Sequence, residues 1–113
     1  MRTAGIIGGL GPETTSEFYL NVLFSVQQKS RVARPPLLIW NVPLPFAIEE
    51  EFILQATGAE RYIPYLTDAA QHLERAGADF LVMPCNSLHM FIEQIRTNVK
   101  VPVISIIEET MAR

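Results

Sequence analysis

Four short apolar segments, each followed or preceded by a stretch of helical character, constrain the fold of this chain more than any other feature. The segments cover residues 3–8, 37–42, 78–83 and 101–104. Glycine or proline stands at their boundaries, as at Gly8-Gly9 and Pro35-Pro36, which is typical of strands that break into loops. Because these runs are apolar on both faces, we expect buried strands of a parallel sheet with helices on both sides.

Helices are expected in four places between the strands, at residues 13–29, 48–55, 58–77 and 86–98. The stretch that ends at Gly77 has the clearest 3.6-residue period, and a terminal glycine is a usual helix stop. We interpret the three acids at 49–51 as a solvated face of a short connector. Right-handed crossovers between such elements predict a three-layer αβα sandwich with a four-stranded parallel sheet. A further helix is expected to begin at Ser105 and to stop after two turns, as in a truncated chain or a fragment.

Composition restricts the classes of partner. A chain of 113 residues that is 49% hydrophobic has room for one domain, expected over residues 1–113. A net charge of −3 without an extended basic cluster argues against a nucleic-acid partner. No apolar run approaches the roughly 20 residues that span a bilayer, so no membrane partner is expected. One cysteine and two histidines predict no internal disulfide and no metal site, and a cytoplasmic location.

Three loops fall at the carboxyl ends of the predicted strands, where open parallel sheets bind their ligands. They cover Gly8–Pro12, Asn41–Pro45 and Pro84–His89. We expect them to converge on one crevice. Each loop alone is a weak indication of a site, and their convergence is the main inference.

The first loop contains Gly9, Leu10 and Gly11. Position 14 is threonine where a dinucleotide-binding loop has its third glycine, and the chain has no Gly-Lys-Ser/Thr motif of a P-loop. Backbone N–H groups of such a loop can approach an anion, such as a substrate carboxylate. The alternative is a tight turn between strand and helix.

The segment Pro84-Cys85-Asn86-Ser87-x-His89 is the strongest local signal. It places a thiol at the end of a strand and the start of a helix, where the partial positive charge of the helix favours the reactive thiolate. Asn86 and Ser87 offer donors for a carboxylate or oxyanion. The alternative is that Cys85 is a small buried hydrophobe and Asn86 only a helix cap. His89, one turn further on, and Asn41, at the end of the second strand, are secondary candidates.

These motifs together resemble the aspartate/glutamate racemase family, and they occur in the same order along the whole chain. The residues that carry the resemblance are Ile6-Ile7-Gly8-Gly9-Leu10-Gly11-Pro12, Asn41-Val42-Pro43, Arg75-Ala76-Gly77-Ala78-Asp79, Met83-Pro84-Cys85-Asn86-Ser87-x-His89 and the run from Val101 to Thr110.

The resemblance implies a cofactor-independent amino-acid racemase that uses two cysteines on opposite faces of the substrate's α-carbon. Such proteins consist of two similar flavodoxin-like α/β halves with the site between them. Cys85 matches the cysteine of the first half, while Asn86 and Ser87 match the residues that hold the α-carboxylate. The second cysteine belongs to a C-terminal half that has no counterpart in these 113 residues. The chain thus corresponds to an N-terminal half, expected to be inactive alone.

The substrate and the partners are less constrained by the resemblance. Aspartate-specific members have an Asp-Arg-Thr run after Asn-x-Pro, whereas this chain reads Pro45-Phe46-Ala47-Ile48-Glu49. Aspartate or glutamate is the expected substrate, with hydantoin racemase and maleate isomerase as related alternatives. A non-catalytic carboxylate-binding α/β domain is the alternative from another class. The similarity of the family's two halves also leaves a homodimer open.

Overall fold

The structure is a computed structural model that describes residues 2–29 and 32–104. Its sheet contains four parallel strands in the order β2-β1-β3-β4. The strands are β1 (Ala4–Gly8), β2 (Leu37–Asn41), β3 (Phe80–Val82) and β4 (Val103–Ile104). The predicted four-stranded parallel sheet is therefore confirmed, although β3 and β4 are shorter than the apolar runs that indicated them. The helix expected to begin at Ser105 lies outside the described residues.

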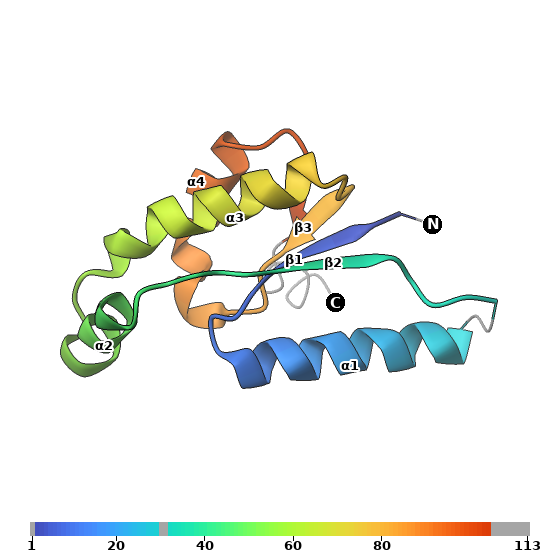
Figure 1. The fold of residues 1–113 in the computed structure, drawn as a ribbon, viewed down its shortest axis with the longest axis horizontal. Coiled ribbons are helices and arrows are strands. Elements are labelled where there is room, and N and C mark those ends of the chain that lie inside the picture. Colours follow the sequence, from blue (N-terminus) through green and yellow to red (C-terminus); the bar gives the residue numbers. More distant parts are fainter. Residues whose placement is uncertain (1, 30–31, 105–113) are drawn as a thin grey trace.

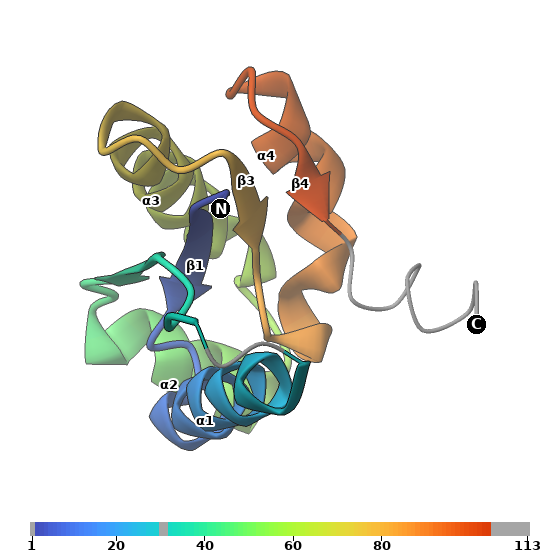
Figure 2. The same cartoon turned by 90° about the vertical axis from the view of Figure 1, so that its right-hand side faces the viewer.

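Helices lie on both sides of this sheet, as the predicted three-layer arrangement requires (Figure 1, Figure 2). On one side is α1, and on the other are α3 and α4, while α2 lies at the end toward which the strands run. The helical elements, including two short 3₁₀ helices, are α1 (Pro12–Lys29), α2 (Phe46–Gln55), η1 (Ala59–Tyr62), α3 (Ile63–Arg75), η2 (Asn86–Phe91) and α4 (Ile92–Thr97). In the described part of the chain, no helix is both long and apolar enough to cross a bilayer.

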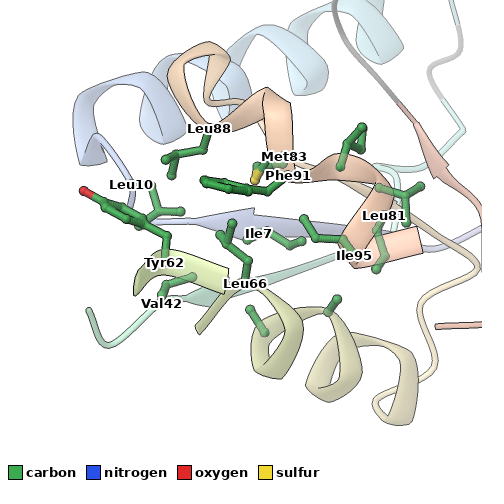
Figure 3. Packing of buried hydrophobic residues seen from close by; sticks show 14 of the residues in the cluster. Ile7, Leu10, Val42, Tyr62, Leu66, Leu81, Met83, Leu88, Phe91 and Ile95 are labelled. Carbon is green, nitrogen blue, oxygen red and sulfur yellow. The ribbon is translucent and has the colours of Figure 1, made fainter. Parts of the chain in front are cut away.

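The main core fills the space between the sheet and the α3 side (Figure 3). Its centre is formed by side chains from strand and helix that are at most 1% exposed: Ile7, Leu66, Leu81, Leu88 and Ile95. Burying a side chain of this size stabilises the fold by roughly 1.5–3 kcal/mol. The core therefore holds together the segments that lead into the loops after β1 and β3.

The end of α3 is built as the sequence predicts. Gly77 has a φ of 104°, a left-handed conformation that a residue without a Cβ adopts readily. Its N–H donates to the Glu74 carbonyl, and the Ala78 N–H donates to the Leu73 carbonyl. These two bonds form a Schellman motif, which satisfies carbonyls at the helix end. The turn sends the chain directly back toward β3.

Two of the predicted helices are divided in the structure. The stretch expected as one helix from Gly58 consists of η1 followed by α3, and the stretch expected at residues 86–98 consists of η2 followed by α4. The connector α2 begins at Phe46, two residues before the predicted start. Pro45 takes an extended conformation as its N-cap, so the proline restricts the chain for a shorter distance than expected.

The α1 side of the sheet is less completely covered than the apolar strands predict. None of the 18 residues of α1 is buried, and Phe24 is 57% exposed. Strand β1 is buried on both faces, since its neighbours Ile6 and Ile7 are 0% and 1% exposed, but Ile39 of β2 is 44% exposed. The expectation of full burial is thus wrong for β2, because this strand lies at the edge of the sheet.

Candidate functional site

A cavity of about 970 Å³ lies beside the loops that follow β1 and β3. Its walls come from the glycine loop, the first turns of α1, one face of α2, the end of η1 and the segment after β3. The lining residues are Leu10, Gly11, Pro12, Glu13, Thr14, Glu17, Phe18, Asn21, Glu49, Phe52, Ile53, Tyr62, Pro84, Cys85 and Leu88. Two of the three predicted loops thus meet at this cavity. The loop Asn41–Pro45 does not line it, and α2 takes its place.

Cys85 reaches the cavity through a tight turn around Pro84. The Cys85 N–H donates to the Met83 carbonyl at 2.9 Å, which closes a three-residue γ-turn at the end of the strand. The fixed φ of proline suits this turn. Cys85 itself is extended, with φ −142° and ψ 102°, and its side chain is partly exposed. The thiol is therefore held by the core on one side and open to the cavity on the other.

The helix that follows Cys85 differs from the predicted one. Cys85 is the N-cap of η2, a 3₁₀ helix of six residues, and no side-chain hydrogen bond caps it. The alternative interpretation of Asn86 as only a helix cap therefore does not hold, because the N-cap is Cys85. Asn86 and Ser87 are the first two residues of η2, directly beside Cys85 in the chain. The helix dipole is weaker support for a thiolate here, because a short 3₁₀ segment aligns few peptide groups.

The glycine loop is held in a fixed shape by its own backbone. Gly9 and Gly11 have φ of 87° and 92°, in the left-handed region that favours glycine. The Gly9 N–H donates to Thr15 Oγ1 at 3.0 Å, so the protein itself satisfies a group that we expected to face an anion. Gly9 lies against the Asn41 side chain. Of the predicted anion-binding residues in this loop, only Leu10 and Gly11 line the cavity.

Tyr62 lies where the core meets the cavity. It is 4% exposed, and its ring packs edge-on against Phe52 with centroids 5.5 Å apart. Figure 3 shows its hydroxyl at the edge of the apolar cluster, beyond Leu10. Burial raises the pKa of Tyr62 above its ordinary value of 10.0, and the nearby charges of Glu49 and Cys85 raise it further. The hydroxyl therefore stays protonated at neutral pH, as a neutral hydrogen-bonding group.

Several cavity residues could not be identified from the sequence. Tyr62 belongs to an apolar helical stripe, which predicts core and nothing more. Glu49 lies in the acidic run that we interpreted as a solvated face; in the structure it lines the cavity, whereas Glu51 pairs with Arg61 at 2.8 Å. The secondary candidate His89 is partly buried in η2 and does not line the cavity. In residues 2–29 and 32–104, no group of three His, Cys, Asp or Glu side chains could hold a metal ion.

Comparison with known proteins identifies the family. The family model of Asp/Glu/hydantoin racemases matches residues 7–113. The chain belongs to this family. It is 31% identical over 111 residues to the broad specificity amino-acid racemase RacX of Bacillus subtilis (strain 168), an alignment that covers 95% of the chain and 47% of RacX.

Solved structures of similar proteins share the fold of this chain. An aspartate racemase homologue from Pyrococcus horikoshii OT3 shares 32% identity with a TM-score of 0.81, over 100% of this chain and 50% of that one. A putative Asp/Glu racemase from Yersinia pestis shares the fold at 23% identity, with a TM-score of 0.86 over 99% of this chain and 48% of that one. The chain thus spans about half the length of these relatives. The family relates it to isomerases of the racemase type.

Proposed function

We propose that this chain is the first-cysteine half of an amino-acid racemase and that Cys85 moves the proton on one face of the substrate's α-carbon. The single observation that carries the proposal is the position of Cys85. In a chain of the racemase family, its only thiol lines a large cavity at the carboxyl ends of parallel strands. Such crevices are the usual ligand sites of open α/β sheets.

The proposed chemistry needs no cofactor. The thiolate of Cys85 takes the proton from the α-carbon and becomes a thiol, and the electron pair of the broken C–H bond stays on the substrate as a carbanion. A second thiol on the opposite face then gives its proton to that carbon and becomes a thiolate. The product is the mirror-image amino acid. The reactive form of cysteine is the thiolate, and each proton transfer requires the sulfur within hydrogen-bond reach of the carbon.

The neighbours of Cys85 fit the task of holding the substrate. Asn86 and Ser87 follow it directly, and we assign them to the α-carboxylate, together with the backbone of Leu10 and Gly11. The protonated hydroxyl of Tyr62 adds a neutral group that can donate or accept a hydrogen bond. Phe52 and Leu88 supply apolar walls. By excluding water, these walls strengthen every electrostatic interaction in the site.

The second base must come from outside these 113 residues. The sequence contains one cysteine, and the chain covers about half of its relatives. We therefore propose that the complete active site requires a second half with its own cysteine, and that this chain alone does not invert amino acids at an enzyme-like rate. Thiol chemistry of this kind needs reduced cysteines, which fits a cytoplasmic protein.

Exchange of the α-proton with solvent tests the role of Cys85. The 113-residue chain is incubated in deuterium oxide with aspartate, glutamate, lysine or alanine, and the loss of the α-proton signal is followed by NMR. We expect slow exchange on at least one amino acid that disappears in Cys85→Ser and Cys85→Ala. Met90→Ala is the matched control, because Met90 carries sulfur in the same segment, is 64% exposed and lies outside the cavity lining.

Two results would decide against the proposal. Exchange that persists in both Cys85 variants would assign the proton transfer to another group. No exchange on any of the four amino acids, with the protein folded by circular dichroism, would favour a domain that binds small carboxylates without catalysis.

A further inference from the structure

Thr15 holds the glycine loop without lining the cavity. It lies in the first turns of α1, and its hydroxyl oxygen accepts a hydrogen bond from the Gly9 N–H at 3.0 Å. Its own N–H donates to the Gly11 carbonyl at 3.1 Å. Thr15 is therefore bonded to both ends of the segment Gly9–Gly11. Because it is not itself a lining residue, any effect of Thr15 on the cavity must pass through this loop.

The direction of the bond between Gly9 and Thr15 shows that it serves the loop and not the helix. Polar side chains at a helix start usually accept from N–H groups further along the helix, and a threonine inside a helix often bonds to the carbonyl four residues earlier. The Thr15 hydroxyl accepts instead from a residue outside α1, six positions earlier in the chain. The helix thus gains little from this side chain, while the loop gains a fixed point.

The spaces beside two successive glycines are filled by Thr15 and by Asn41. A Cβ at Gly8 would lie 2.9 Å from the Thr15 methyl group, and a Cβ at Gly9 would overlap the Asn41 side chain. The Gly8 carbonyl also accepts from the Val42 N–H at 2.9 Å. The start of the loop is therefore clamped between the first turns of α1 and the end of β2. Asn41 does not line the cavity, and its contact with Gly9 links the end of β2 to the loop.

Two peptide groups of the loop remain for a ligand. Leu10 and Gly11 line the cavity together with Cys85, and within residues 2–29 and 32–104 their N–H groups donate no hydrogen bond. The Leu10 side chain is 8% exposed and belongs to the core (Figure 3). The loop is thus fixed at Gly9 by Thr15 and at Leu10 by the core. These two anchors determine where the two N–H groups lie.

We infer that Thr15 is a positioning residue, whose hydroxyl holds Gly9 so that the N–H groups of Leu10 and Gly11 meet the α-carboxylate of the substrate beside Cys85. The inference rests on the proposed function and adds to it a residue that touches neither the substrate nor the thiol. Without the hydroxyl, the loop spends part of its time in other shapes. The apparent affinity then falls by the fraction of molecules that keep the binding shape.

Thr15→Val and Thr15→Ser test the role of the hydroxyl. Valine keeps the branched shape and removes the acceptor, whereas serine keeps the acceptor and removes the methyl group. The ¹⁵N-labelled 113-residue chain is titrated with aspartate, glutamate, lysine or alanine, and the amide signals of Leu10 and Gly11 are followed by NMR. We expect at least one amino acid to shift both signals. Its dissociation constant should rise about fivefold in Thr15→Val, as the loss of one hydrogen bond implies, and stay within twofold in Thr15→Ser. Thr15→Ala is a second variant without the hydroxyl and should weaken binding in the same direction.

The kinetics of deuterium exchange separate positioning from a general loss of stability. In Thr15→Val, the amino-acid concentration that gives half the maximal rate should rise about fivefold. The rate at saturation should stay within twofold, because Cys85 is unchanged. Ile95→Val is the matched control, since Ile95 is 1% exposed, lies in α4 and does not line the cavity. It costs a similar amount of stability and should change neither affinity nor exchange.

Three outcomes would overturn the inference. They are an unchanged affinity in Thr15→Val, equal weakening in Thr15→Ser or in Ile95→Val, and no shift of the Leu10 and Gly11 signals with any of the four amino acids. The proposed function fails separately. Exchange that persists without Cys85, together with weaker binding in Thr15→Val, would overturn only the role of the thiol. Exchange that depends on Cys85 but saturates at the same concentration in Thr15→Val would overturn only the role of Thr15.

Discussion

Replacing Gly9 by alanine should destabilise the protein through two separable effects. Gly9 has a φ of 87°, and a left-handed conformation costs a residue with a Cβ about 1–2 kcal/mol. Part of this cost is offset by about 0.4–1 kcal/mol, because alanine restricts the unfolded chain. In addition, the new Cβ would overlap the side-chain oxygen of Asn41. Since that side chain is short and can turn away, we expect the low end of an overpacking cost, about 1 kcal/mol.

Gly77→Ala provides the matched comparison. Gly77 has a φ of 104°, but nothing lies within 4 Å of a Cβ at this position. The two variants should therefore share the backbone cost, and Gly9→Ala should be less stable than Gly77→Ala by about 1 kcal/mol. Urea denaturation followed by circular dichroism measures this difference. Asn41→Ala in the Gly9→Ala background should remove it. Equal stability of Gly9→Ala and Gly77→Ala would refute the steric argument.

Three further predictions concern the core, the glycine loop and pH. Leu66→Ala should lower the free energy of unfolding by about 2–5 kcal/mol, because Leu66 is 0% exposed; a change below about 1 kcal/mol in urea denaturation would contradict the described core. Thr15→Val should cost about 1 kcal/mol in the same assay, since the Gly9 N–H loses its acceptor; an unchanged midpoint would rule that bond out as a stabilising contact. The pKa of Tyr62 is higher in the folded protein than its ordinary value of 10.0. The protonated hydroxyl therefore contributes stability that is complete below pH 10 and is lost as the pH rises through the raised pKa. Stability measured from pH 8 to 11 should therefore fall less steeply in Tyr62→Phe than in the original chain, and parallel curves would contradict the shift.

The sheet could be predicted from the sequence because its signals are local. Apolar runs of strand length are bounded by glycine and proline, and Gly77 marks the end of α3 with the conformation that the end requires. Two other features do not follow from such local signals. Nothing in the run from Asn86 distinguishes a 3₁₀ helix from an α-helix. The exposure of Ile39 depends on its strand being at the edge, which the order of strands determines.

The cavity could be predicted only in part. The loops after β1 and β3 converge because parallel strands end at the same side of a sheet, and this follows from the pattern of elements. The walls formed by Glu17, Glu49 and Tyr62 depend on how α1, α2 and η1 pack against those loops. A carboxylate on a solvated helix face and one on a cavity wall have the same sequence pattern. Their roles therefore became apparent only from the tertiary structure.

The central claim is that Cys85 acts on one face of the α-carbon and that inversion needs a second thiol from elsewhere. The most direct test is the ratio of inversion to deuterium incorporation in a single amino acid, measured by chiral chromatography with mass detection on the 113-residue chain. We expect deuterium incorporation that depends on Cys85, with the product keeping the configuration of the starting amino acid. Rapid inversion by this chain, persisting in Cys85→Ala, would contradict the account.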